Sequence, residues 1–228
     1  MARSQLLKDI VGGQVSIENI LLRLKIILTD LDNEPIMNWI NGELQGYKNE
    51  EDVPKYRILK GTPKGTFVVN SVVQYTNANV PLHNLITDEM YDSLITLNVK
   101  NSITSIQNIL NGENRDNFAK SISTELSHAM STMQVQITGM SIRYTSLDLE
   151  AMVSNVKSKL VDIVMELEKQ FDNLDDMDIK DQIEESSSKR DQAVYNIEQI
   201  IYEGSIEIGD KNKISKSILG HLFGGGKE

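Results

Sequence analysis

The sequence of 228 residues contains no cysteine. Disulfide bonds, thiolate metal ligands and cysteine nucleophiles are therefore excluded. Histidine is scarce as well, and His83, His128 and His221 do not form the HxxxH or HExxH spacing that is typical of a zinc site. No recognisable catalytic motif is present, so we assign no catalytic residue and expect no metal and no cofactor.

Long hydrophobic runs are also missing. No stretch reaches the roughly 18 consecutive apolar residues that a membrane span needs, and the first residues, MARSQLLKDIVGGQ, hold no apolar core long enough for a secretory signal. Positive charge is in short supply, with 23 Lys and Arg against 33 Asp and Glu, a formal net charge of -10. Because non-specific nucleic-acid affinity comes mainly from Lys and Arg, we do not expect nucleic acid as a partner. We expect a cytoplasmic protein without a membrane span.

What the sequence does contain is helical periodicity. Apolar residues recur three and four positions apart after Ser16, after Pro35 and after Ser146, and a shorter helix is predicted at 4–11. Residues 118–130 have the same spacing and predict a further helix. The fold that we expect is α+β, with amphipathic helices packed on a small, mostly antiparallel sheet and followed by a long C-terminal helix and a short β tail.

Strands are predicted from β-branched residues and period-two alternation. Residues 56–76 indicate a hairpin with its turn at 61–65. In QVQITGMSIRY the apolar parity changes at Thr138-Gly139, which predicts one strand with a β-bulge.

The C-terminal part differs from the rest. We expect an α+β domain at 1–172, a long helix at 173–203 and a short β tail with a flexible end at 204–228. The helix has a thin apolar stripe that Ser186-Ser187-Ser188 interrupts, which predicts an exposed helix or one packed on a partner chain. The tail predicts two short strands, which are marginally stable alone, so we expect a homo-oligomer. The residues predicted to form the oligomer contacts are Ile197, Ile201, Ile206, Ile208, Ile214 and Ile218.

One segment, NWINGELQGYKNEEDVPKYR, gathers side chains that are common in interiors and active sites. Trp39, Glu43 and Tyr47 belong to the helix after Pro35, and Tyr56 and Arg57 begin the strand that follows the charged loop. A charge-assisted bond between Arg57 and Glu43 would join helix and strand. The cluster is therefore a structural joint, a ligand site or an active site.

The same residues carry a family resemblance. W-I-x-x-E-L-x-G-Y at 39–47 and P-x-Y-R at 54–57, with L-L-R at 21–23 and LDLEAMVSNVKSKLVDIVMELEK at 147–169, resemble the AbiTii domain family over about residues 3–172. The resemblance implies a bacterial protein linked to abortive infection, a form of phage defence. It implies no particular reaction.

Three functions are compatible with these observations. The first is a non-enzymatic defence component that recognises a phage protein or a neighbouring defence protein and assembles with itself. The second is an effector enzyme directed at nucleic acid or a nucleotide, in which Arg57 holds a phosphate and Glu43 is a base or metal ligand. The third is an acidic adaptor or antitoxin-like protein that binds a basic partner through residues 166–185.

Overall fold

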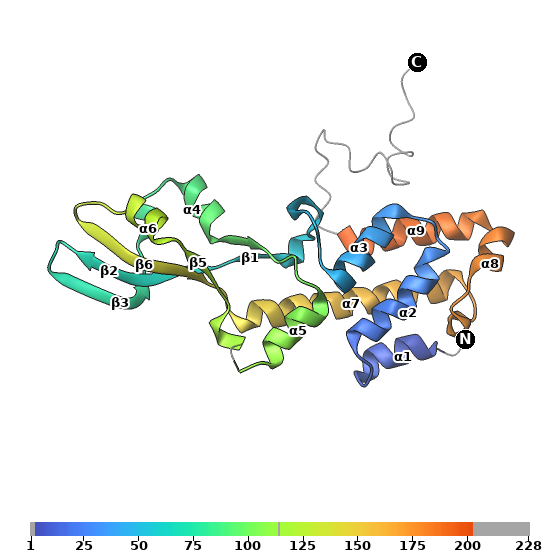
Figure 1. The fold of residues 1–228 in the computed structure, drawn as a ribbon. Coiled ribbons are helices and arrows are strands. Elements are labelled where there is room, and N and C mark those ends of the chain that lie inside the picture. Colours follow the sequence, from blue (N-terminus) through green and yellow to red (C-terminus); the bar gives the residue numbers. More distant parts are fainter. Residues whose placement is uncertain (1–2, 114, 203–228) are drawn as a thin grey trace, which may run out of the picture. The chain divides into compact units, whose positions relative to one another are not determined.

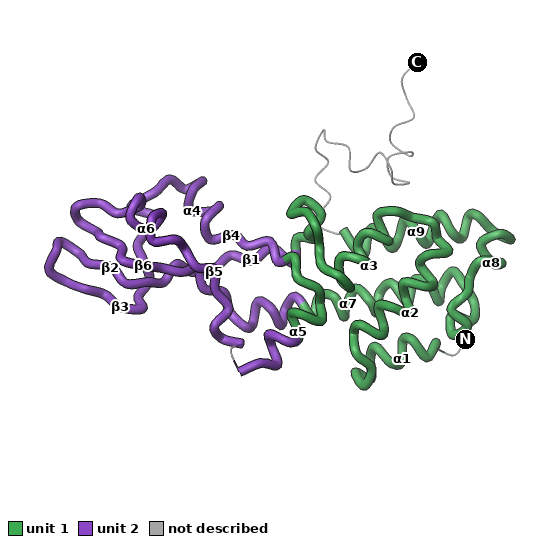
Figure 2. The backbone as a smooth tube through the Cα atoms, in the orientation of Figure 1, with its two compact units in different colours: residues 1–55, 100–107, 153–228 green, residues 56–99, 108–152 purple. Residues whose placement is uncertain are grey.

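The computed structural model describes residues 3–113 and 115–202 of the chain. They divide into two compact units (Figure 2): unit 1 comprises residues 3–55, 100–107 and 153–202, and unit 2 comprises residues 56–99, 108–113 and 115–152. The fold is α+β, as predicted, with helices in both units and antiparallel sheets in unit 2 (Figure 1). The further division of the chain at residues 172 and 203 stays a prediction.

Unit 1 is helical. Its N-terminal helices begin where the sequence predicts them, because Ser4, Ser16 and Asn33 each accept a backbone N–H from three residues further on. The helical elements that lie wholly or partly in this unit are α1 (Gln5–Gly12), α2 (Ile17–Thr29), α3 (Glu34–Gln45), the 3-10 turn η1 (Glu50–Asp52), α5 (Ile103–Asn111), α7 (Ser146–Gln170), the 3-10 turn η5 (Leu174–Asp176), α8 (Lys180–Glu185) and α9 (Ser187–Tyr202).

The core of unit 1 comes from the apolar stripes that the periodicity indicates. The side chains without any exposed surface include Leu21, Leu24, Ile27, Leu28, Ile36, Ile40, Leu160, Ile163, Val164 and Leu167, from α2, α3 and α7. Burial of such side chains is worth roughly 1.5–3 kcal/mol each before entropy is counted, so this shared core is the main stabilising feature of the unit.

The end of the described chain corrects one expectation. The segment predicted to be one long helix, 173–203, contains the turn η5 and two helices, α8 and α9, which are separated at Ser186, whose backbone is extended (φ −150°, ψ 90°). The expectation of an exposed helix is wrong, because the apolar side chains of α9, Ile197 and Ile201 among them, are buried within this chain. Polar contacts hold α9 as well: Arg190 Nε donates to the Leu31 carbonyl (2.9 Å).

Unit 2 contains a four-stranded antiparallel sheet in the order β3-β2-β6-β5 and a two-stranded sheet, β1-β4. Its strands are β1 (Ile58–Lys60), β2 (Thr62–Val69), β3 (Val73–Asn79), β4 (Thr96–Asn98), β5 (Ala119–Ile122) and β6 (Val135–Arg143). Its helical elements are the 3-10 turns η2 (Lys55–Arg57), η3 (Leu82–Asn84) and η4 (Arg115–Asn117) with α4 (Asp88–Ile95) and α6 (Thr124–Ala129), to which α5 and α7 add their unit 2 ends.

The bulge predicted in QVQITGMSIRY is confirmed. Thr66 lies opposite Gly139 and Phe67 opposite Ile137, so Thr138 is the extra residue of β6. Its hydroxyl donates to the Thr66 carbonyl at 3.0 Å. The change of apolar parity in the sequence therefore corresponds to one bulged strand.

Two other local predictions are wrong. The turn expected at 61–65 lies inside the start of β2, and the reversal between β2 and β3 occurs at Asn70 and Ser71, with φ of 50° and 58°. Two successive residues with positive φ are the mark of the tight hairpin turns that match strand twist. Residues 118–130 are not one helix, because β5 comes first and Ser123 then caps α6.

The residues that the structure describes include no helix that is both long and apolar enough to cross a membrane.

Candidate functional site

The structure divides the predicted cluster between the two units. Trp39, Glu43 and Tyr47 belong to unit 1, where α3 and the residues directly after it place them. Tyr56 and Arg57 belong to unit 2, in η2, directly before β1. The pairing of Arg57 with Glu43 stays a prediction.

Within unit 1, Glu43 and Tyr47 are brought together. The Tyr47 hydroxyl donates to Oε1 of Glu43 at 2.8 Å, and both residues are buried. The tyrosine can return to the helix because Gly46 ends α3 with φ +91°, a conformation that favours glycine. The Tyr47 backbone N–H then donates to the Lys100 carbonyl at 2.8 Å. The helix end is thereby fixed to the segment that enters α5.

Gly42 completes this arrangement. A Cβ at Gly42 would lie 2.3 Å from Cε1 of Tyr47, so the tyrosine ring rests directly on the helix backbone. Four residues of GELQGY therefore have a defined part in this contact: the Tyr47 ring packs on Gly42, its hydroxyl donates to Glu43, and Gly46 lets the chain turn back toward the helix.

In unit 2, Arg57 has no exposed surface, whereas Tyr56 is half-buried. Nη1 of Arg57 donates to the Val99 carbonyl at 3.2 Å, and the Val99 N–H donates to the Arg57 carbonyl at 2.9 Å. These two bonds extend the β1–β4 pairing, in which Ile58 lies opposite Asn98. Arg57 therefore joins the residues that precede β1 to those that follow β4.

The chemistry open to this cluster follows from its burial. Glu43 and Arg57 are both 0% exposed. A solute could reach neither the carboxylate nor the guanidinium unless the surrounding structure opened. Charged groups that are enclosed in this way are held by hydrogen bonds from the protein itself.

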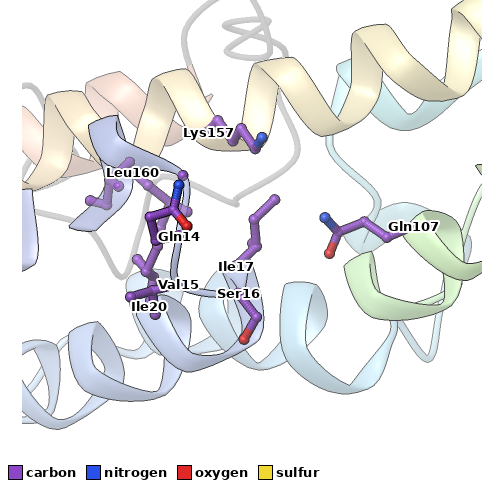
Figure 3. A pocket seen from close by; sticks show the side chains of 10 residues that line it. Gln14, Val15, Ser16, Ile17, Ile20, Gln107, Lys157 and Leu160 are labelled. Atoms are coloured by element: carbon purple, nitrogen blue, oxygen red, sulfur yellow. The ribbon is translucent and has the colours of Figure 1, made fainter. Parts of the chain in front are cut away.

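A separate cavity lies within unit 1, with a volume of about 280 Å³. It is lined by Ile10, Gly13, Gln14, Val15, Ser16, Ile17, Ile20, Gln107, Lys157 and Leu160. Figure 3 shows Gln107 with its amide directed toward Ile17, and Lys157 on the adjacent helix α7. Sequence reasoning did not find this cavity, because its walls come from three separate segments of the chain.

Lys157 is the charged residue of that lining, and it forms no ion pair with another residue of the described chain. The residues three and four positions away on α7 are Val153, Ser154, Leu160 and Val161, so α7 supplies no acidic partner at helical spacing. The volume of about 280 Å³ is just below the range for small-ligand sites, about 300–1,000 Å³. The lining of the cavity combines apolar side chains with the amides of Gln14 and Gln107 and the ammonium group of Lys157.

The acidic segment 166–185 does more than face solvent. Oε1 of Glu168 accepts hydrogen bonds from the Ser4 N–H (2.8 Å) and hydroxyl (2.7 Å), while Oε2 pairs with Arg3 at 2.7 Å. Asp175 accepts the Gln5 N–H at 2.7 Å. Burial alone would raise the pKa of Glu168, but the bonds from Arg3 and Ser4 outweigh it and leave that pKa below its usual value.

These acids therefore complete the N-terminus of α1. The sequence carried a signal for this role, because α1 has no acid in its own first turn. In the part of the chain that the structure describes, no group of acids and histidines is arranged to hold a metal ion.

Glu198 is a further buried acid that sequence reasoning did not single out. It is 3% exposed, and its Oε1 accepts a hydrogen bond from Asn33 Nδ2 at 2.9 Å. Burial raises the pKa of Glu198, and the bond from Asn33 opposes that rise without cancelling it. Tyr202, one turn later, donates its hydroxyl to the Pro35 carbonyl at 3.0 Å. Together they fix α9 to the start of α3.

The described chain has an α+β fold in which the marker residues Glu43 and Arg57 are buried, the first in unit 1 and the second in unit 2. The AbiTii family model matches residues 4–192, so the chain belongs to the AbiTii family. Membership points to abortive-infection defence. No curated protein matches the chain, and no solved structure matches it either.

Proposed function

We propose that this chain is a component of abortive-infection defence that acts by recognition and self-assembly, and not by catalysis at Glu43 and Arg57. The observation that carries the proposal is the complete burial of both residues, with Glu43 bonded to Tyr47 and Arg57 bonded to Val99. A catalytic acid or a phosphate-binding arginine has to meet its substrate. In this chain both groups are enclosed, Glu43 accepting a hydrogen bond from the Tyr47 hydroxyl and Arg57 donating one to the Val99 carbonyl.

Recognition would use the end of the four-stranded sheet. Val72 and Met133 are 83% and 88% exposed, and the Asn70 N–H donates to the Gln134 carbonyl at 2.8 Å. That bond places the β2–β3 turn beside the loop that precedes β6. Exposed apolar side chains gathered at one place are typical of a binding surface for another protein. The partner would be a phage protein or a neighbouring defence protein.

Recognition is tested by phage-protection assays on a variant that carries Val72→Asp and Met133→Asp. Both side chains are exposed, so the melting temperature should change little while protection is lost. Leu147→Asp is the matched control, since Leu147 is also exposed, at 71%, but lies on α7. Full protection by the double variant would rule this surface out.

Self-assembly would use the tail. The two short strands predicted around residues 209–212 lie outside the described residues, and two strands alone are marginally stable. Light scattering on the full chain and on a chain that ends at Tyr202 tests this. The cut has to follow α9, because a cut at 173 would remove the buried Val194, Ile197 and Ile201 from the core. We expect an oligomer for the full chain and a monomer for the shortened one; a monomeric full chain would contradict self-assembly.

The enzymatic alternative predicts a different response at Arg57. With Arg57→Lys, the structural role predicts that melting temperature and phage protection fall together, because the planar guanidinium and its bond to Val99 are lost. Loss of protection at an unchanged melting temperature would favour an active site instead. Arg143→Lys, at an exposed position on β6, is the control and should change neither quantity.

A further inference from the structure

The four-stranded sheet has two edge strands, and they differ in chemistry. β5, at one edge, has the sequence AKSI and carries Lys120. β3, at the other edge, has the sequence VQYTNAN and carries no charged residue. A charged side chain is a common means of preventing an edge strand from pairing with another chain. β3 lacks that protection.

β3 is also exposed along nearly its whole length. Residues 73–77 are all exposed, with Val73 at 48% and Tyr75 at 46%. Val73 lies opposite Val69, Gln74 opposite Val68 and Tyr75 opposite Phe67, after which the register shifts and Asn77 takes a φ of 52°. The regular part of the edge is therefore short, Val73–Tyr75, and suits a strand of three or four residues.

The side chains of this short edge have a defined pattern. Tyr75 stacks on Phe67, with ring centroids 5.1 Å apart, and Val73 has the same parity as Tyr75. Gln74 faces the other way. A strand that adds to this edge would match it best with two apolar residues separated by one polar residue, because cross-strand neighbours on one face interact directly.

The chain itself contains such a segment beyond the described residues. Ser205-Ile206-Glu207-Ile208 has an apolar, polar, apolar pattern, whereas the second predicted strand places Lys216 on the same parity as Ile214 and Ile218. The first of the two segments therefore fits the β3 edge, and the second does not.

We propose that Ser205–Ile208 of one copy adds as a fifth strand to the outer edge of β3, at Val73–Tyr75, of a second copy. The inference rests on the proposed self-assembly and names its receiving surface. Ile206 and Ile208 lie beside Val73 and Tyr75, and Glu207 lies on the side of Gln74. Main-chain hydrogen bonds supply the affinity, and the two isoleucines supply the selectivity.

The absence of cysteine permits a direct test on the full chain. Single-cysteine variants Gln74→Cys and Glu207→Cys are mixed and treated with a short bismaleimide, which tolerates a register shift of two residues. We expect covalent dimers in the mixture at several times the yield of either variant alone. Ser121→Cys, on the exposed edge strand β5, is the matched control and should give no such excess with Glu207→Cys.

Three outcomes would overturn the inference. The first is equal cross-linking through positions 74 and 121. The second is efficient cross-linking of Glu207→Cys alone, which would show that tails pair with tails. The third is an intramolecular cross-link in the double variant Gln74→Cys/Glu207→Cys while the mixture of single variants gives no dimer. That result would show that the tail binds β3 of its own copy.

In the second case the full chain still scatters light as an oligomer, so the proposed self-assembly survives while the β3 edge is excluded. A full chain that is monomeric by light scattering contradicts self-assembly itself. As a second measurement, Gln74→Lys with Thr76→Lys should lower the oligomer mass, with circular dichroism confirming the fold, whereas Ser121→Lys should leave the mass unchanged. An unchanged mass for the β3 variant would also count against the inference.

Discussion

The hydroxyl of Tyr47 donates a hydrogen bond to the carboxylate of Glu43, 2.8 Å away, one turn earlier along the chain and out of contact with solvent. Glu43 lies in the last turn of α3, where the carbonyl end of the helix disfavours negative charge. A donor at this position therefore offsets two costs, the burial of an acid and its place at the wrong end of the helix. The pair explains why glutamate and tyrosine occur four residues apart in this motif.

Replacing Tyr47 by Phe should reduce stability without a change of shape. The ring would remain on Gly42, but Oε1 of Glu43 would lose this donor inside the protein, at a cost of about 1–3 kcal/mol. Chemical denaturation measures the change in the free energy of unfolding. Tyr75→Phe is the control, since Tyr75 is 46% exposed and keeps its stacking on Phe67. Equal stability of the two variants would contradict the role given to the Tyr47 hydroxyl.

Gly42→Ala should destabilise the chain although alanine is the better helix former. The new Cβ would lie 2.3 Å from the Tyr47 ring, so the ring has to move, with an expected cost of roughly 1–3 kcal/mol. Gly12→Ala, at the end of α1, meets nothing within 4 Å and should be neutral or stabilising by up to ~1 kcal/mol. Thermal unfolding of the two variants measures these opposite changes in stability. A Gly42→Ala variant as stable as the parent would show that the Tyr47 ring does not pack on Gly42.

Glu168→Gln tests the acid that completes α1. The folded state holds the pKa of Glu168 below its unfolded value, so its contribution to stability is present above the unfolded pKa and disappears as the pH falls through the folded pKa. We expect the variant to lose about 1–3 kcal/mol at pH 7 and to approach the parent in strong acid. Denaturation curves across that pH range measure this. Glu150→Gln, exposed on the same helix, should change little at either pH.

Glu198→Gln should change stability in the opposite direction and stabilise the chain at neutral pH. Burial raises the folded pKa of Glu198, so the ionised acid opposes folding at neutral pH, and this cost disappears as the pH falls to the unfolded pKa. Glutamine keeps an acceptor for Asn33 and removes the buried charge. The variant should therefore melt a few degrees higher at about pH 7 than the parent, and the gain should shrink in acid. A gain that is independent of pH, or one also seen with the exposed Glu184→Gln, would contradict this account.

The sequence correctly predicts the helices and strands that are determined by residues close to one another in the chain. Ser4, Ser16 and Asn33 begin helices because their side chains cap the next turn, and no distant residue is needed for that. The bulge at Thr138 is visible because one residue of shift inverts the apolar parity of a strand.

The sequence predictions that are wrong concern segments whose structure depends on residues far away in the sequence. Pro63 and its glycine neighbours indicate a turn locally, yet Pro63 lies opposite Ile142 inside the sheet, a partner far along the chain. The apolar stripe of α9 is thin in the sequence, yet Ile197 and Ile201 are buried in the fold, where α9 contacts α3 and Asn196 of α9 donates a hydrogen bond to Glu166 of α7. Ser4 likewise meets Glu168 across 164 positions of sequence, which no local pattern reports.

For the candidate site, residue types were sufficient to find the motif but not to decide its role. Whether a solute can reach Glu43 and Arg57 depends on everything that packs around them, and both are buried in the fold. The cavity beside Lys157 was beyond local reasoning for the same reason, since α1, α2, α5 and α7 meet there only in the folded chain.

Unit 1 is assembled from both ends of the polypeptide, and this has a consequence for synthesis on the ribosome. The first helix leaves the exit tunnel early, but the residue that anchors it, Glu168, is made when most of the chain has already emerged. Until then α1, which carries the buried Leu6, Leu7 and Ile10, can pack on α2 but lacks its contact with the later η5. Early-exposed apolar segments of this kind are binding sites for chaperones, so the nascent chain should depend on them until α7 is complete.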